Sequence, residues 1–392
     1  MPADPHAVLP LIDSTLLTDV VRQAQRNPAF DILTSTVQPL SHAKIIDTTG
    51  GLFLFSGTGR DEHGPRSWSI VLKILNNPKE WGQDPRYWAY WKRELLAFQS
   101  GLLATLPPSL RAPRCYGTTE HEHNGWIWME HIEESTGRHW SLDQFHRAAR
   151  QAGRCAGAFL GGVPLPDEPW LSAPFFRSVF ADGDWWATHM DPAAPSNAWQ
   201  SPLVQQGFSE ALRSGVLRIW AEKQRFWEVI DRLPQVLCHN DFHRRNLMLR
   251  MGADGQEELV ALDWAFCGVG ALGLDLGELV ATSACFFEVE PEEVGELEAT
   301  VLDGYLAGLQ DAGWSGDPQV VRLGYLVSAL LGKGATLPGW AAVMLSEEAG
   351  IDVQAMYGRS ADGVLAGWVR LTEFLLSRAD ESRQLMRKLG LA

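Results

Sequence analysis

The fold is decided by the sequence LCHNDFHRRNLML (residues 237–249), followed after a polar turn by LVALDW (residues 259–264). Both runs are apolar and strand-like, and the Asp-Gly pair between them is a strong signal for a β-hairpin. Asp241 and Asn246 share one tight loop before the first strand, and Asp263 closes the second. The stretch therefore predicts a hairpin that carries polar side chains where its strands begin and end.

This arrangement suits the transfer of a phosphoryl group from a metal-nucleotide. The reaction needs a carboxylate near the attacking hydroxyl and oxygen ligands that hold Mg²⁺ against the phosphates. Because Mg²⁺ prefers oxygen, a carboxamide and a carboxylate are the expected protein ligands. The spacing H-x-D-x-x-x-x-N with a later Asp is that of a kinase catalytic loop and its metal-binding Asp. His239, Asp241, Asn246 and Asp263 have this spacing.

The stretch resembles the catalytic loop of the aminoglycoside phosphotransferase and choline kinase-like family, whose small-molecule kinases share the protein-kinase-like fold. In that family a second His commonly follows the catalytic Asp by two residues, as His243 does here, whereas a protein kinase usually has Lys. The resemblance implies that Asp241 is the catalytic base and that Asn246 and Asp263 bind Mg²⁺. It also implies that ATP is the phosphate donor and that His239 supports the loop.

The resemblance further implies an α+β, two-lobed protein-kinase-like fold. A small antiparallel-sheet lobe over residues 1–134 would bind the nucleotide, and a mainly helical lobe over residues 135–392 would hold the catalytic residues and the substrate. The first lobe agrees with a succession of strand-like runs and a helix, at residues 36–40, 52–56, 68–75 and about 85–99.

Lys73 lies inside the third of these apolar runs. An isolated Lys in a strand usually faces solvent, but here the run is apolar on both sides, so the side chain must snorkel or point somewhere special. The family has a Lys on its third strand that contacts the nucleotide phosphates, and Lys73 matches it. Its expected acidic partner is Glu94 on the following helix. Gly50 and Gly51 would permit close backbone approach to the phosphates, although no G-x-G-x-x-G is present.

A strand over residues 126–132 would become the hinge between the lobes. By resemblance, the Glu130 carbonyl and the Ile132 amide would bind adenine, and Asp275 matches a family Asp that braces the catalytic region. Residues 266–277 are too rich in Gly for a regular element. Helices are predicted at residues 13–25, 142–160, 203–230, 278–287, 291–312, 319–331 and 364–389.

Composition indicates a globular protein, because 45% of the 392 residues are hydrophobic and 21% are charged. The net charge of −15 argues against nucleic acid as a partner, since that calls for a basic face. Five scattered Cys without a paired motif suit reduced thiols. The N-terminus lacks the features of a signal peptide, and the most apolar stretch, at residues 323–345, is interrupted by Lys333. We therefore expect a soluble, cytoplasmic enzyme without a membrane partner.

Two other classes of protein remain. A nucleotide-binding pseudokinase or scaffold usually lacks one of the catalytic Asp, the Asn, the metal Asp or the Lys, and all four are here. A protein kinase is disfavoured by His243 and by the absence of an Ala-Pro-Glu segment after Asp263. The two His and the Asp of the loop could also be read as a metal cluster, but they lack a matching Cys or His group at zinc-site spacing.

The acceptor is left open among aminoglycosides, amino sugars, choline-like alcohols and other hydroxylated metabolites or antibiotics. The densest group of carboxylates after the catalytic loop comprises Glu288, Glu290, Glu292 and Glu293. Helix starts favour acidic residues, so capping or a solvated face explains most of them. A cationic acceptor would nevertheless need several carboxylates around its ammonium groups, so we expect the acceptor to be an amine-bearing sugar or alcohol that contacts this cluster.

Overall fold

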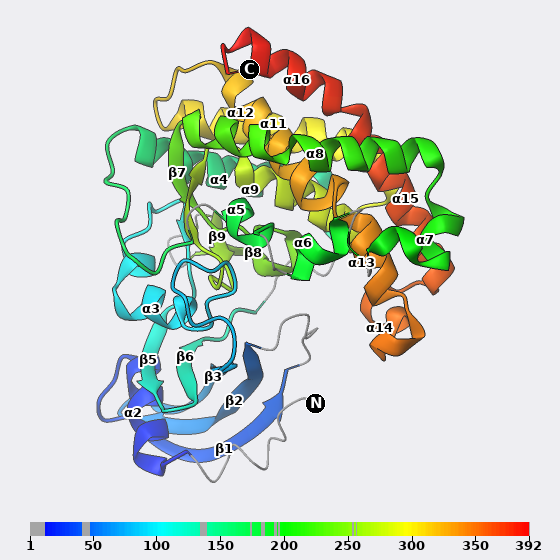
Figure 1. Cartoon of the computed structure of the whole chain (residues 1–392). Coiled ribbons are helices and arrows are strands. Elements are labelled where there is room, and N and C mark those ends of the chain that lie inside the picture. The colour runs from blue at the N-terminus through cyan, green and yellow to red at the C-terminus, as the bar shows by residue number, and fades with distance from the viewer. Residues whose placement is uncertain are drawn as a thin grey trace.

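The computed structural model of the protein describes residues 12–40, 48–133, 139–172, 175–181, 185–191, 194, 197–252, 255 and 257–391. A lobe built on an antiparallel sheet lies at the bottom of Figure 1, and a larger helical lobe lies above it. The α+β architecture predicted from the sequence is therefore present. The predicted boundary near residue 134 lies outside the described residues and stays a prediction.

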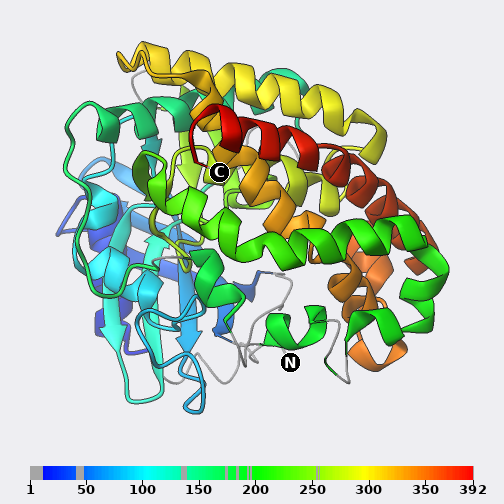
Figure 2. The same ribbon diagram turned by 45° about the horizontal axis from the view of Figure 1, so that its top comes forward.

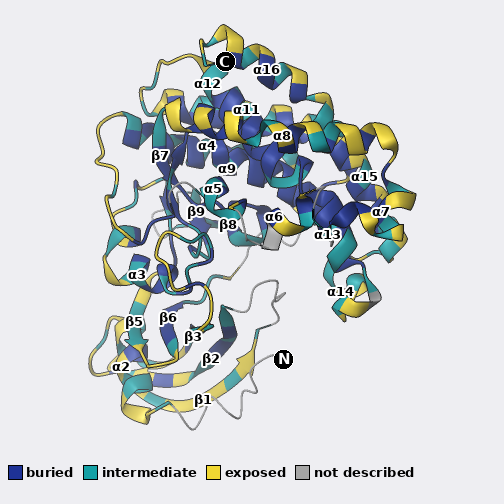
Figure 3. Cartoon of the chain, in the orientation of Figure 1, coloured by how far each residue is buried: buried dark blue, intermediate teal, exposed yellow. Residues whose placement is uncertain are grey.

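The sheet of the first lobe has five strands in the order β1-β2-β3-β6-β5, each antiparallel to its neighbours. The outer strand β1 is largely exposed, as Figure 3 shows. Helix α2 covers one face of the sheet and α3 the other. The bounds are α2 Ser14–Gln25, β1 Asp31–Pro39, β2 Thr49–Asp61, β3 Gly64–Asn76, α3 Arg93–Gln99, η2 Leu102–Ala104, β5 Cys115–Glu120 and β6 Asn124–Glu130.

Burial on both faces explains why β3 is apolar throughout. Ile70, Leu72 and Ile74 belong to the core under α2, whereas Val71 and Leu75 belong to the core under α3. Because successive side chains of a strand point to opposite faces, Lys73 lies on the α3 face. The strand itself therefore aims this cation at the helix that carries its predicted partner.

Helix α3 is shorter than predicted, because it begins at Arg93 and not near residue 85. The Arg93 guanidinium donates hydrogen bonds to the carbonyls of Pro85, Tyr87 and Trp88, at 3.0, 2.6 and 2.7 Å. These carbonyls are thus satisfied by a side chain, and residues 85–92 form turns in place of a helix.

The predicted hairpin is present, and its strands β8 and β9 pair from Leu247 opposite Ala261 onward. The amide of Leu262 also donates to the carbonyl of Asn246 at 2.8 Å, so the end of the catalytic loop lies beside the residue preceding Asp263. The Gly-rich segment after Asp263 is more regular than predicted, because it forms β10 and α9. The bounds are β4 Leu110–Arg111, β7 Gln235–Cys238, η4 Arg244–Asn246, β8 Leu247–Met251, β9 Glu257–Ala261, β10 Gly268–Ala271 and α9 Leu274–Gly277.

The helical lobe is divided more finely than the sequence predicts. Ser209 caps a new helix, α8, and so splits the helix predicted over residues 203–230, while Arg378 separates α15 from α16. The bounds are α4 Leu142–Leu160, α5 Phe175–Val179, α6 Trp185–Met190, η3 Ala198–Gln200, α7 Pro202–Gly207, α8 Glu210–Arg232, η5 Glu278–Thr282, α10 Ser283–Cys285, η6 Pro291–Glu293, α11 Val294–Asp311, α12 Pro318–Ala329, η7 Leu330–Gly334, α13 Leu337–Met344, η8 Glu347–Ala349, α14 Val353–Tyr357, α15 Ala361–Ser377 and α16 Ala379–Lys388. Two of these elements, η5 and η7, are π-helical turns.

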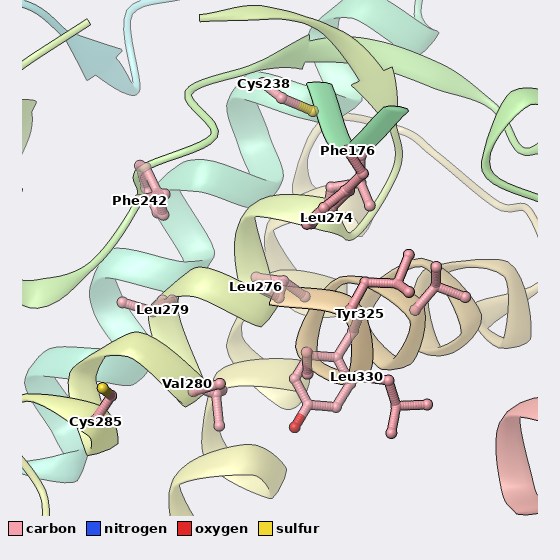
Figure 4. Close-up of a cluster of buried hydrophobic side chains, with 14 of the residues drawn as sticks. Phe176, Cys238, Phe242, Leu274, Leu276, Leu279, Val280, Cys285, Tyr325 and Leu330 are labelled. Carbon is pink, nitrogen blue, oxygen red and sulfur yellow. The ribbon is translucent and has the colours of Figure 1, made fainter. Parts of the chain in front are cut away.

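The core of this lobe surrounds α9 and η5, which follow the catalytic hairpin in the chain. Figure 4 shows Leu276 and Val280 from this segment on the side of Tyr325 of α12 and Leu330 of η7, and Leu279 on the side of Phe242. Helices α15 and α16, orange to red in Figure 2, cover the lobe near α8 and α12. The segment behind the catalytic loop is thus held in the most buried part of the molecule.

One stretch, Pro318–Met344, is long and apolar enough to cross a membrane by length and composition. It comprises α12, η7 and α13, and 78% of its apolar window is buried inside the fold. The stretch therefore forms part of the core of the helical lobe.

Candidate active site

Asp275 of α9 holds the catalytic loop between β7 and β8 in place through hydrogen bonds. One carboxylate oxygen accepts the amide of His239 at 2.9 Å, and the other accepts the amide of Asn240 at 2.8 Å. Asn240 adopts a positive φ of 63° and donates its side-chain amide to the carbonyl of Phe266 at 2.9 Å. Burial raises the pKa of Asp275 to about 6 against the effect of these amides. The predicted bracing role of Asp275 is confirmed.

His239 ties the loop to the strand that ends at Asp263. Its Nε2 lies 2.8 Å from the carbonyl of Leu262, and its Nδ1 lies 3.3 Å from the amide of Asp241. A carbonyl needs a donor and an amide needs an acceptor, so the imidazole is neutral with its hydrogen on Nε2. Burial lowers the pKa of His239 to about 4, which agrees with this state.

Both oxygens of Asp241 are engaged by side chains of the same loop. Oδ2 accepts from Asn246 Nδ2 at 2.7 Å, and Oδ1 lies 3.3 Å from His243 Nε2. Burial would raise the pKa of Asp241, but His243, with smaller contributions from His239 and Lys333, outweighs it and lowers this pKa to about 2. The carboxylate is thus ionised at neutral pH, and 26% of its side chain remains exposed.

Lys73 of β3 meets Glu94 of α3 as predicted, and it also meets Asp263 at the end of the hairpin, a contact that was not predicted. The Lys73 ammonium lies 2.6 Å from Glu94 Oε2 and 2.9 Å from Asp263 Oδ1. Burial would lower the pKa of Lys73, but the two carboxylates outweigh it and raise this pKa above its usual value. Burial also raises the pKa of Glu94, in spite of the attraction of Lys73. The ammonium is therefore charged and held in place.

The remaining oxygens of Asn246 and Asp263 suit a hard cation. The side-chain Nδ2 of Asn246 donates to Asp241, which leaves the side-chain Oδ1 of Asn246 available. Asp263, with a positive φ of 60° and a 40% exposed side chain, has one oxygen on Lys73 and the other free of a described partner. An amide and a carboxylate oxygen are what Mg²⁺ takes from protein when phosphates supply further ligands. Among the described residues, no group of three or more His, Cys, Asp or Glu could hold a metal ion, so the alternative of a histidine-based cluster gains no support.

Gly50 and Gly51 lie at the start of β2, where Gly51 pairs with Ile74 next to Lys73. A Cβ atom at Gly50 would lie 2.5 Å from Asn76 Oδ1, so a larger residue there would have to displace the Asn76 side chain. The structure thus places both residues near Lys73, and their contact with phosphate stays a prediction.

Glu130 and Ile132 lie at and just beyond the end of β6. The side chain of Glu130 is bound by two arginines that the sequence did not point to, Arg111 at 2.7 Å and Arg250 at 3.1 Å. The proposed adenine contacts involve backbone atoms and stay predictions.

Two more charged residues near the site were missed from sequence. Arg93, next to Glu94, is fully buried, and its five N–H groups donate to five backbone carbonyls. Lys333 of η7 is buried near Asp241 and contributes to lowering the pKa of that carboxylate. For both Arg93 and Lys333, the signal in the sequence was a cation among apolar residues of a helical segment.

The predicted acidic cluster is largely neutralised by arginine. Arg245 Nε lies 2.8 Å from Glu288, and Arg370 Nε lies 2.9 Å from Glu292. Glu290 is paired with Arg359, while Glu293 is exposed. The cluster is therefore not a set of free carboxylates.

The model of the phosphotransferase enzyme family matches residues 85–317, more than half of the chain. The protein belongs to this family. A comparison with curated protein sequences finds no match.

Among solved structures, an amicoumacin kinase in complex with AMP-PNP, Ca²⁺ and Ami has a TM-score of 0.52 at 13% identity, over 96% of each chain. A spectinomycin phosphotransferase in complex with ADP and spectinomycin has a TM-score of 0.46 at 12% identity, over 95% of this chain and 99% of that one. An ethanolamine kinase of Plasmodium vivax has a TM-score of 0.45 at 13% identity, over 89% of this chain and 83% of that one. The likeness to the amicoumacin kinase confirms the predicted kinase-like fold. Family and fold together support a small-molecule phosphotransferase.

Proposed function

We propose that the protein transfers the γ-phosphate of ATP to a hydroxyl group of a small molecule. The observation that carries this proposal is the joint assembly of two groups around one hairpin. Asp241 and Asn246 are linked at 2.7 Å before its first strand, and Lys73 is linked to Asp263 at 2.9 Å after its second. A pseudokinase or scaffold has no need to keep both of these pairs.

Each residue has a distinct part in this proposal. Asp241, ionised and fixed on both oxygens, accepts a hydrogen bond from the acceptor hydroxyl and takes its proton as the bond to phosphorus forms. Lys73, aligned by Glu94, neutralises charge on the phosphates. Asn246 and Asp263 would hold Mg²⁺, which supplies further charge neutralisation when bound.

The acceptor class stays open at this level and includes amino sugars, aminoglycosides and amino alcohols. Among the structural neighbours, the amicoumacin kinase was solved in complex with Ami, the spectinomycin phosphotransferase was solved in complex with spectinomycin, and the third is an ethanolamine kinase. We propose that the enzyme is soluble and cytoplasmic, because ATP is the phosphate donor in the proposed reaction.

The test separates binding from chemistry. Asp241→Asn keeps the shape of the side chain but loses the carboxylate, so nucleotide affinity should persist while transfer falls by about two orders of magnitude or more. Asp263→Ala should abolish turnover in the presence of Mg²⁺. Coupled ATP-consumption assays across amino sugars, aminoglycosides, macrolides and amino alcohols measure transfer, and calorimetry measures nucleotide binding.

A matched control is Asp311→Asn, since Asp311 is an ion-paired Asp of α11 bound by Arg150 and Arg154 on the surface. It should leave both quantities unchanged. Normal turnover by Asp241→Asn, or undiminished turnover by the wild type in excess chelator, would refute the mechanism.

A further inference from the structure

The carboxylates next to the catalytic loop are already occupied by partners within the protein. Asp275 uses both oxygens on backbone amides of the loop. Glu278 accepts the hydroxyl of Thr282, and its Oε2 lies 3.4 Å from the Lys333 ammonium. Glu278 and Lys333 belong to the two π-helical turns, η5 and η7, which contact each other. Such turns are rare and are often found at functional sites.

Glu288 is the next carboxylate along this side of the loop. Its side chain is 2% exposed, and its Oε1 accepts from Arg245, the residue before Asn246. Its Oε2 is buried without a hydrogen-bond partner among the described residues, and the nearest basic atom is His139 Nδ1 at 4.0 Å. One carboxylate oxygen at most is therefore available to a ligand here.

Phe286 contacts both His243, which pairs with Asp241, and Arg245, which pairs with Glu288. The ring of Phe286 lies 5.4 Å from that of His243, which contacts Asp241. The Arg245 guanidinium lies 4.2 Å over the same Phe286 ring, and Tyr357 stacks on it with centroids 6.0 Å apart. Phe286 and Arg245 are only partly buried, whereas the side chain of Glu288 is 2% exposed, so the ring and the guanidinium are more accessible than this carboxylate.

These contacts neutralise the two glutamates on this side of the site and leave Asp241 as its ionised carboxylate. Glu278 and Glu288 are balanced by Lys333 and Arg245, at 3.4 and 2.8 Å. A polyamine loses hydration at each ammonium group when it binds, and that cost is recovered only if a carboxylate pairs with each one. An apolar ring has no such cost and gains by covering Phe286.

We propose that the acceptor is an alcohol with an apolar or aromatic part, uncharged or bearing a single amine, and not a polycation. This inference rests on the proposed function and narrows its acceptor. The apolar part lies against Phe286, the hydroxyl faces Asp241, and a single donor group reaches Glu288. Arg245 is then a specificity-determining residue, because it cancels the charge of Glu288.

The experiment compares three probes with the full-length protein: kanamycin as a polyamine, erythromycin as a macrolactone with one amine, and chloramphenicol as an uncharged aromatic alcohol. For each probe, kcat/KM is measured with Mg-ATP, and affinity is measured by calorimetry with Mg-AMP-PNP. We expect kanamycin to be at least about tenfold worse than the better of the other two, a difference of about 1.4 kcal/mol.

A charge variant tests the cause. Arg245→Gln leaves Glu288 without its cation, so the affinity for kanamycin relative to chloramphenicol should rise about tenfold. The ratio cancels any uniform loss of active protein. Arg370→Gln is the matched control, because it frees Glu292 on an exposed surface and should leave the ratio unchanged.

Two results would overturn the inference and leave the proposed function standing: a preference of the wild type for kanamycin, or an unchanged ratio in Arg245→Gln. Failure of the proposed function has a different signature, namely the absence of Mg-AMP-PNP binding by the wild type.

Discussion

At the scale of single residues, hydrogen bonds within the catalytic loop decide which nitrogen of His239 and of His243 carries the hydrogen. His239 cannot be protonated without losing the hydrogen bond that Nδ1 accepts from the amide of Asp241. His243 has the same arrangement, because its Nδ1 accepts from the amide of Arg245 at 3.3 Å. Its Nε2 hydrogen is therefore the one directed at Asp241. His239 thus contacts Asp241 through its backbone amide and His243 through Oδ1, and both imidazoles position the proposed base.

The buried His239 makes stability dependent on acid. Its pKa is about 4 in the folded protein, below the usual 6.5, so between these values the unfolded chain takes up a proton that the folded protein does not. The free energy of unfolding should therefore fall as pH drops from 6.5 to 4, by up to about 3 kcal/mol from this residue.

His239→Gln should remove this part of the pH dependence. Urea unfolding measured from pH 4 to pH 7 would test it, with a smaller slope expected in the variant. Asp275 acts in the opposite sense, because burial raises its pKa to about 6 and the folded protein binds its proton more tightly than the unfolded chain. The test is therefore the difference between the pH slopes of the variant and the wild type, and not the wild-type slope alone. Equal slopes would show that His239 is not buried as the neutral form.

At the scale of elements, α3 is held in place by Arg93. The guanidinium binds the carbonyls of the preceding turns and also reaches Trp170 at 2.8 Å and Ala265 at 2.9 Å, in the helical lobe. Burial lowers the pKa of Arg93 to about 10, so it stays charged at neutral pH. One side chain thus fastens the helix of Glu94 to the segment that follows Asp263. The contact of Lys73 with both carboxylates depends on this attachment.

Arg93→Lys should weaken this attachment, because lysine lacks the planar fork that reaches all of these carbonyls. We expect the free energy of unfolding to fall by about 2 kcal/mol or more. The KM for ATP should rise as Glu94 and Lys73 lose alignment. Thermal unfolding and steady-state kinetics measure the two effects.

Lys92→Met is the neighbouring control. Lys92 pairs with Glu120 on the surface at 2.6 Å, and such pairs contribute about 1 kcal/mol or less. If the two variants behaved alike, the buried contacts of Arg93 would have no special role.

At the scale of the whole molecule, an ion-pair network around Glu130 joins the two lobes. Glu130 at the end of β6 binds Arg111 of β4 and Arg250 of β8, and both arginines also approach Glu258 of β9, at 3.0 and 3.6 Å. Burial would raise the pKa of Glu130, but Arg111 outweighs it and lowers this pKa below its usual value. The network therefore links the five-stranded sheet to the sheet that carries the catalytic hairpin.

Glu130→Gln should leave Arg111 and Arg250 with Glu258 as their one acidic partner among the described residues. We expect the free energy of unfolding to fall by about 1–3 kcal/mol. Because the network is partly exposed, added salt should weaken the wild type more than the variant. Urea unfolding at low and high ionic strength measures both effects, and an identical salt response in the two proteins would contradict the role of the network.

The sequence by itself determined the local features of this protein. The spacing from His239 to Asn246, the hairpin that follows and the strand containing Lys73 depend on neighbouring residues and on period-two burial, so they can be read along the chain. The pairing of Lys73 with Glu94 was also predictable, although only through resemblance to a family. These features account for the four residues to which the proposed chemistry is assigned.

Tertiary structure alone decided which charges are cancelled. Glu288 looked available in the sequence, but Arg245 lies 43 positions away and meets it across the lobe at 2.8 Å. Arg93 likewise gave no sign of its contact with Trp170, 77 positions further on. Pairing between distant side chains depends on how helices and strands pack, and composition records only that both charges exist. The catalytic loop could therefore be found from sequence, whereas the electrostatic character of the acceptor side required the fold.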